Sequence, residues 1–96
     1  MDTRHYVYIV LCSDNTLYTG YTTNIERRIA THNTGKGARY TRARLPVSLV
    51  ASWECVGKIE ALRMEYALKR FPRAQKLRLI NSPDLIGQYM TLIANE

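Results

Sequence analysis

Cysteine and extended apolar runs are both scarce in this sequence. The two cysteines, Cys12 and Cys55, are far apart and lack the paired spacing of zinc ligands, which argues against a zinc site. We expect no signal peptide in the polar first five residues, and therefore buried thiols rather than a disulfide. No apolar run approaches the roughly 20 residues that a membrane-spanning helix needs. We therefore expect a cytoplasmic protein that does not contact a membrane.

Acidic residues are few beside the basic ones. The 96 residues include 14 Lys and Arg against 8 Asp and Glu, a net charge of +6. A basic domain suits a polyanion, because Lys and Arg that neutralise phosphates release condensed counterions. Basic proteins without such a partner also exist, so charge alone leaves nucleic-acid binding open.

Phenylalanine is nearly absent, although tyrosine is common. The chain has seven Tyr and one Phe. Phe fills apolar space equally well, so the excess of hydroxyls indicates hydrogen bonding. Tyr8 and Tyr18 are candidates, although ordinary strand packing is the simpler interpretation for any single tyrosine.

One α+β domain is predicted: a small three-stranded antiparallel sheet flanked by helices, in the order β-β-α-β-α-α. Runs of β-branched and aromatic residues predict strands at 6–12, 17–22 and 47–56. Four turn-forming residues join the first two strands, which predicts an antiparallel hairpin. Helices are expected at about 25–33, at 58–70 and from 73 onward.

The helix boundaries have recognisable signals. Thr23 as N-cap and Glu26 three residues later predict a capping box for the first helix. Gly35 and Gly37 should end that helix. Ser82 and Pro83 predict the start of a last, weakly amphipathic helix. We expect residues 1–82 to form the domain and residues 83–96 to form a helical extension packed on it.

The first helix carries ionisable groups beside its apolar face. At about 100° per residue, Arg28 and His32 lie at the edge of the face that Ile25 and Ile29 bury. A basic group held there is positioned for a function, or it extends over the core edge with its charge in water. Helix geometry leaves both interpretations open.

The second helix carries a carboxylate where an apolar residue belongs. Ile59, Leu62 and Tyr66 define its predicted apolar stripe, and Ala61 and Leu68 extend this stripe on one side. Glu65 falls inside the same arc, between Ala61 and Leu62. A carboxylate there needs a cation, because an uncompensated buried charge is unfavourable. Lys69, one turn on, is one partner, and a divalent metal ion that takes only one or two protein carboxylates is the other.

These segments together resemble a known family. Tyr6-Val7-Tyr8, followed about ten residues later by Tyr18-Thr19-Gly20, resembles the paired GIY and YIG strands of the GIY-YIG nuclease superfamily. The segment 24–33 resembles its first helix, and 61–66 resembles the helix that bears its metal-binding glutamate. The sequence is similar to small stand-alone bacterial single-domain members, and to the nuclease domain of the catalytic subunit of a eukaryotic structure-selective endonuclease. Tyr6 replaces the first glycine of GIY, and we expect no second domain.

The resemblance implies a metal-dependent endonuclease fold and a site. It implies hydrolysis of phosphodiester bonds, in DNA rather than RNA, in DNA repair or processing. A single Mg²⁺ or Mn²⁺ would be held by Glu65, and Arg28 would offset charge on the phosphoryl oxygens. Tyr8 or Tyr18 would orient or deprotonate the attacking water, and His32 would contact phosphate or assist proton transfer. The nucleic-acid backbone would contact a basic loop made of Lys36, Arg39, Tyr40, Arg42 and Arg44.

Other functions remain compatible with the same residues. The basic loop is otherwise a solvated surface loop. The chain could be a non-catalytic nucleic-acid-binding module, or an adaptor for a larger repair protein. A protein partner is one candidate source of target choice. An exposed apolar patch on the last helix, at Leu85, Ile86, Tyr89 and Leu92, would favour the adaptor.

Overall fold

Three strands form one antiparallel sheet in the computed structural model, which describes residues 3–89. The strands are β1 (His5–Leu11), β2 (Leu17–Thr22) and β3 (Ser48–Cys55), in the order β2-β1-β3. The central strand β1 pairs with both neighbours, so β2 is an edge strand. The predicted hairpin and the α+β class with a three-stranded antiparallel sheet are therefore confirmed.

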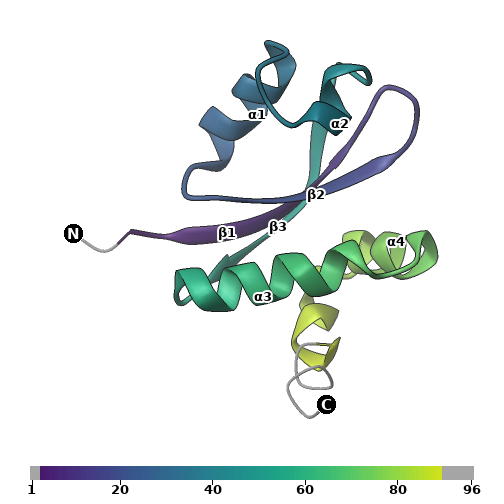
Figure 1. The fold of residues 1–96 in the computed structure, drawn as a ribbon. Coiled ribbons are helices and arrows are strands. Elements are labelled where there is room, and N and C mark those ends of the chain that lie inside the picture. Colours follow the sequence, from purple (N-terminus) through teal and green to yellow (C-terminus); the bar gives the residue numbers. More distant parts are fainter. Residues whose placement is uncertain (1–2, 90–96) are drawn as a thin grey trace.

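Helices cover both faces of this sheet (Figure 1). Helix α1 (Ile25–Asn33) and the one-turn helix α2 (Arg39–Arg42) lie on one face. Helix α3 (Lys58–Lys69) and helix α4 (Arg73–Asn81) lie on the other. The segment predicted as a basic loop thus contains the short helix α2, which the sequence analysis did not expect.

Strand alternation divides the interior into two cores. Successive side chains of β1 point to opposite faces. Val7 and Ile9 pack beneath the sheet against Trp53 of β3 and Leu68 of α3. The neighbouring Tyr8 and Val10 point the other way, into a smaller core that Ile29 of α1 covers. The smaller core therefore carries a tyrosine at its centre.

Helix α3 buries the side on which Ala61 and Leu68 extend the predicted stripe, and exposes the centre of that stripe. Ile59 and Tyr66 of the expected stripe are 72% and 66% exposed, whereas Ala61, Met64 and Leu68 are buried. The helix has apolar residues on two sides, and the side with small alanines is the one that packs on the sheet. A small side chain lets the helix backbone come close to the strands, so packing decided between the two faces.

The helix start and the C-terminal segment differ in detail from the predictions. Asn24, rather than Thr23, caps α1, because its side-chain oxygen accepts a hydrogen bond from the backbone of Arg27 at 3.0 Å. The last helix begins as a 3₁₀ turn, η1 (Pro83–Leu85), whose Pro83 carbonyl accepts a hydrogen bond from the Trp53 indole at 3.0 Å. Its expected continuation over 90–96, with Leu92, lies outside the described residues.

Two further expectations concern cysteine and membranes. Cys12 and Cys55 are both buried free thiols, as predicted. None of the helices between residues 3 and 89 combines the length and apolar character required to cross a bilayer.

Gly20 permits the closest approach inside the small core. It lies opposite Tyr8 in the β1–β2 ladder, so any Cβ at this position would point at the tyrosine. Such a Cβ would overlap the Tyr8 hydroxyl and ring, and the fully buried ring has no free space into which to move. The glycine of the YIG-like segment is therefore required for space.

We expect Gly20→Ala to lower the free energy of unfolding by about 1–3 kcal/mol, the usual range for overpacking a core. A loss of stability would point to the overlap with Tyr8, because Ala in a strand interior normally stabilises a protein by about 0.5–1 kcal/mol relative to Gly. Urea denaturation of both proteins measures the difference.

Gly87→Ala is the control. Gly87 is helical and a Cβ there meets nothing within 4 Å, so this change should leave the free energy of unfolding unchanged or raise it by up to about 1 kcal/mol. Equal losses in the two variants would contradict the role given to close packing at Gly20.

Candidate active site

The candidate site lies at the edge strand β2, where helices from the two faces of the sheet come together. Helix α3 contacts both β2 and β1 from below, and α1 covers the same strands from above. The predicted catalytic residues come from four elements of the fold: Tyr8 of β1, Tyr18 of β2, Arg28 and His32 of α1, and Glu65 of α3. Direct contacts join Tyr8, Tyr18, Arg28 and His32, and Glu65 is linked to Tyr18 through Lys69.

Tyr8 lies at the centre of the site. Its hydroxyl is 2.8 Å from Nε2 of His32, and it accepts a hydrogen bond from Nε of Arg28 at 3.3 Å. Burial raises the pKa of Tyr8, the Arg28 cation lowers it, and the charges of Tyr18 and Glu65 raise it further. Tyr8 is thus a neutral phenol in electrostatic contact with every other member of the group.

His32 is the most deeply buried residue of α1. Helical spacing predicted His32 at the edge of the buried face, but its ring is fully buried. Both ring nitrogens have partners, since Nδ1 lies 2.8 Å from the Thr41 hydroxyl. Burial lowers the pKa of His32, and the Arg28 charge lowers it further, so the ring is neutral at pH 7. A polar ring can occupy the core because Tyr8 and Thr41 satisfy it.

Two residues that the sequence analysis did not select hold this ring. Thr41 is fully buried and supplies the second hydrogen-bond partner. Gly37 lies against the ring, and a Cβ there would overlap Nδ1 and the backbone of His32. A buried histidine requires a polar partner for each ring nitrogen, so burial of His32 would have predicted that a second partner exists. Which residue it is depends on the path of the segment after α1, which the sequence pattern does not predict.

Tyr18 stands between the buried pair and the surface. Its ring meets His32 edge-on, with centroids 5.5 Å apart, and it is stacked on Tyr40 at 5.8 Å. The ammonium of Lys69 lies 5.9 Å from the ring centroid. Unlike Tyr8, Tyr18 is only partly buried. The Tyr18 ring therefore contacts Tyr40 of α2 on one face of the sheet and Lys69 of α3 on the other.

Glu65 has the ion pair that the sequence left as one of two alternatives. Its carboxylate is 3.5 Å from Lys69 Nζ, and its side chain is 21% exposed. No group of three His, Cys, Asp or Glu within residues 3–89 is arranged to hold a metal ion. One partly buried carboxylate with a long ion pair fits an ion such as Mg²⁺, which takes one or two protein carboxylates and completes its shell with water and phosphate.

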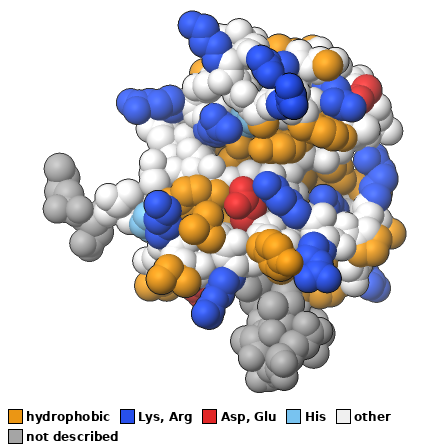
Figure 2. All heavy atoms as spheres, in the orientation of Figure 1, with side chains coloured by type: hydrophobic (Ala, Val, Ile, Leu, Met, Phe, Trp, Pro, Cys, Tyr) orange, Lys and Arg blue, Asp and Glu red, His pale blue; other side chains and the backbone are white. Residues whose placement is uncertain are grey.

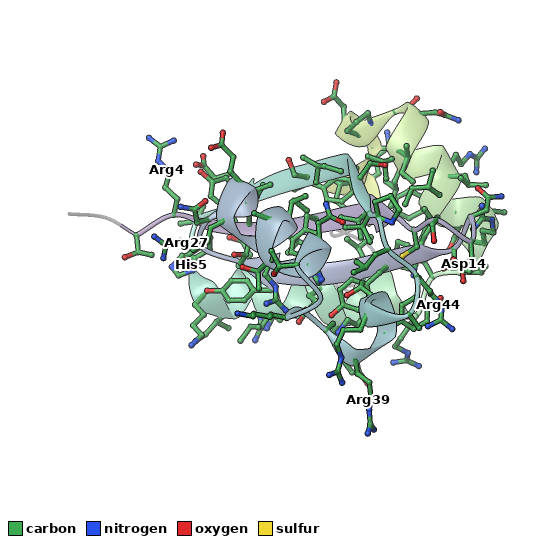
Figure 3. All side chains as sticks on the ribbon, turned by 90° about the horizontal axis from the view of Figure 1, so that it is seen from above. Arg4, His5, Asp14, Arg27, Arg39 and Arg44 are labelled. Atoms are coloured by element: carbon green, nitrogen blue, oxygen red, sulfur yellow. The ribbon has the colours of Figure 1, made fainter. Side chains whose placement is uncertain are left out.

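The predicted binding residues divide into two kinds. Lys36, Arg39 and Arg42 are exposed, and Figure 3 shows Arg39 projecting away from the body of the protein. Arg44 instead lies beside Asp14, with Nε 2.9 Å from the carboxylate, and covers the Tyr40 ring at 4.0 Å. It also donates to the Tyr40 carbonyl at 2.7 Å. Arg44 therefore holds Tyr40 in place. Across the face in Figure 2, Lys and Arg groups outnumber Asp and Glu groups.

Comparison with known proteins gives one consistent family. The model of the GIY-YIG catalytic domain matches residues 4–78. The UPF0213 protein SH2523 of Staphylococcus haemolyticus is 62% identical over 77 residues, which cover 80% of this chain and 94% of that protein. The UPF0213 protein NP_0776A of Natronomonas pharaonis is 51% identical over 80 residues, covering 83% and 94%.

Solved structures agree with these relatives. The solution NMR structure of the UPF0213 protein BH0048 from Bacillus halodurans is 51% identical, covers 81% of this chain and 83% of that one, and superposes with a TM-score of 0.54. The solution NMR structure of EF2693 from E. faecalis is 38% identical, covers 88% and 90%, and has a TM-score of 0.60.

We expect the buried His32 to make folding less stable in mild acid. Its pKa in the folded protein lies below the ordinary value of 6.5, so the unfolded chain binds the proton more readily. The contribution of the neutral His32 ring to the free energy of unfolding is fully present above about pH 6.5. It decreases as the pH falls through that value toward the pKa of His32 in the folded protein. Urea denaturation between pH 8 and pH 5 measures the slope, which should flatten in His32→Gln. Parallel slopes in the two proteins would rule out His32 as the source.

Proposed function

Because the chain belongs to the GIY-YIG catalytic domain family, we propose that it is a metal-dependent endonuclease that hydrolyses phosphodiester bonds in DNA, with a role in DNA repair or processing. One observation carries the proposal. Arg28 and Glu65 lie near the same edge strand, on opposite faces of the sheet. The Arg28 guanidinium is hydrogen-bonded to the buried Tyr8 hydroxyl, and the Glu65 carboxylate is partly buried. A scissile phosphate between Arg28 and Glu65 would meet a cation and a metal ligand together.

Arg28 is assigned to the phosphoryl oxygens. Its Nε donates to the Tyr8 hydroxyl, which fixes the plane of the guanidinium and leaves its two terminal nitrogens for a ligand. A planar guanidinium with two free nitrogens binds phosphate through two parallel hydrogen bonds. Because its orientation is set before substrate binds, little reorganisation is needed as charge develops on the phosphate.

Burial supports Tyr18 rather than Tyr8 as the group that orients the attacking water. Tyr8 has no exposed surface, and its hydroxyl is already hydrogen-bonded to His32 and Arg28. Tyr18 reaches the surface of the edge strand, beside Lys69. A group that orients a water molecule must lie within hydrogen-bond reach of it. In this assignment Tyr8 and His32 hold Arg28 from behind and do not contact phosphate.

Glu65 is assigned to a single Mg²⁺ or Mn²⁺. When bound, the ion supplies positive charge to the scissile phosphate and to the leaving oxygen. Glu65 would exchange its long contact with Lys69 for the ion, which frees the ammonium for a phosphate. The edge position of β2 keeps the carboxylate near solvent, as an ion that retains several waters requires.

The exposed cations beside the site are assigned to the DNA backbone. Lys36, Arg39 and Arg42 are exposed in the same segment as Tyr40, whose ring Arg44 covers. These charges would contact phosphates and give affinity without sequence preference. The preference for DNA over RNA, the role in repair and a protein partner that selects the target are parts of this proposal.

The Lys69–Glu65 pair favours one rival function. A non-catalytic nucleic-acid-binding module would keep this pair for stability alone and would need no metal. The adaptor receives less support, because Leu85, Ile86 and Tyr89 of the expected patch pack against the larger core. The following experiment on Glu65 separates the enzyme from the binding module.

We expect Glu65→Gln to abolish cleavage of DNA while binding of DNA persists. The amide has lost the charge that holds the cation, and one negative charge that faces the phosphate is removed. Mn²⁺ should raise the unfolding temperature of the wild type by mass action, but not that of the variant. Thermal unfolding with and without Mn²⁺, beside a cleavage assay on branched, duplex and single-stranded DNA, measures both effects.

Glu54→Gln is the control for this experiment. Glu54 forms an exposed pair with Arg4 at 3.1 Å on β3, at the opposite edge of the sheet from β2. It should keep both cleavage and the response to Mn²⁺. A Glu65→Gln protein that cuts as well as the wild type would refute the metal assignment and favour the binding module.

We expect the double change Arg39→Gln and Arg42→Gln to weaken binding to all DNA sequences alike. Each lost contact should flatten the dependence of log K on log salt by about 0.9 for duplex DNA, so the two together give nearly two units. Titrations of labelled duplex DNA at several salt concentrations measure this slope.

A double change of Arg73 and Arg78 to Gln removes the same charge from α4, across the sheet from α2. Its salt slope should stay close to that of the wild type. If the α4 variant loses as much slope as the α2 variant, binding follows total charge and not the exposed cations near the site.

A further inference from the structure

A chain of buried hydrogen bonds joins the α2 segment to Arg28. Thr41 is fully buried, and its hydroxyl lies 2.8 Å from Nδ1 of His32 and 2.9 Å from the Ala38 carbonyl. His32 continues to the Tyr8 hydroxyl at 2.8 Å, and that hydroxyl is reached by Arg28 Nε at 3.3 Å. The hydrogen bonds thus run from Thr41 of α2 to His32 of α1, then to Tyr8 of β1, and end at Arg28, which is again on α1.

The two ends of this chain fix the direction of every proton in it. Arg28 has donors only, so its Nε–H donates to the Tyr8 oxygen. Within residues 3–89 the sole acceptor for the Tyr8 proton is then Nε2 of His32. A neutral imidazole that accepts at Nε2 carries its proton on Nδ1 and donates it to the Thr41 oxygen. The Thr41 hydroxyl in turn donates to the Ala38 carbonyl, which has no proton to give.

We propose that Thr41 is a positioning residue that fixes His32 as the Nδ1–H tautomer, and that this tautomer keeps the Tyr8 oxygen turned toward Arg28. The catalytic consequence rests on the proposed function, but the positioning does not. Ala38 also receives the backbone N–H groups of Thr41 and Arg42, so its carbonyl is held by the first turn of α2. The short helix therefore sets the orientation of the hydroxyl on which His32 depends.

The opposite tautomer would disturb Arg28. With the proton on Nε2, His32 would donate to Tyr8, and the Tyr8 proton would have to turn toward the only other partner, Arg28. Two donors would then face each other in a buried site, and the guanidinium would lose its anchor. Thr41 thus acts on the phosphate-binding group through two intermediate residues, without contact with the substrate.

Nitrogen NMR of the histidine rings tests this inference without reference to cleavage. The chain has only two histidines, and a His5→Gln variant assigns the signals of the other one. At neutral pH we expect His32 to be protonated on Nδ1 in the wild type and in Thr41→Ser, which keeps the hydroxyl. In Thr41→Val, which has the same shape without the hydrogen bonds, we expect the Nε2–H form to appear and the Arg28 Nε–H signal to broaden. Backbone amide spectra verify that each variant is folded.

A cleavage assay then tests whether Thr41 affects catalysis. We expect Thr41→Val to lower kcat by about 10- to 100-fold at nearly unchanged KM, the range for residues that orient a functional group from behind. Thr41→Ser should restore most of the rate. A ring protonated on Nε2 in the wild type, or on Nδ1 in Thr41→Val, would overturn the inference. The wild-type spectrum alone gives this answer if Thr41→Val does not fold.

The two proposals can fail separately. If the tautomer follows Thr41 as expected but the wild type cuts no DNA substrate with Mg²⁺ or Mn²⁺, the positioning of His32 holds and the proposed nuclease function fails. If the wild type cuts DNA while His32 carries its proton on Nε2, the nuclease function holds and the role of Thr41 is refuted.

Discussion

The buried hydroxyl of Tyr8 is the constraint around which the upper half of the molecule is arranged. A phenol with no exposed surface needs both an acceptor for its proton and a donor to its oxygen, because a buried polar group without partners costs about 1–3 kcal/mol. Helix α1 supplies both through His32 and Arg28, one turn apart on the same face. Gly20 provides the space for the ring, so the YIG-like strand and the first helix depend on the same atom.

The position of the site follows from the small size of the sheet. With three strands, the edge strand β2 lies only one strand from the centre, and helices lie on both faces of the sheet. An exposed edge strand is usually a liability, since its unpaired backbone groups can pair with another chain. Here Tyr18 of that strand is enclosed by Tyr40 on one side and Lys69 on the other. In the proposed function, a phosphate bound at this edge would meet cations from both faces of the sheet.

The sequence predicted what depends on local pattern and missed what depends on distant packing. The strands were predicted correctly because β-branched and aromatic runs are local signals, and Arg28 and His32 were selected because helical spacing is local. The centre of the buried face of α3 was predicted wrongly, since the helix has apolar residues on two sides and the fit of Ala61 against the sheet decides between them. Thr41 could not be selected, because its contact with His32 is made by the path of an irregular segment.

Polar packing of this kind is an inefficient way to stabilise a core, which bears on why the chain has it. Phe at position 8 and an apolar residue at position 32 would fill the same volume without any requirement for partners, and buried polar networks are often replaceable by apolar groups without loss of stability. Arg28 has no such substitute, because an acceptor behind Nε fixes the guanidinium without occupying the terminal nitrogens that the proposed function assigns to phosphate. Tyr8 provides that acceptor, His32 takes its proton, and Thr41 satisfies His32. Each member is needed because of the one before it, and the series begins at Arg28, the group proposed to bind the phosphate.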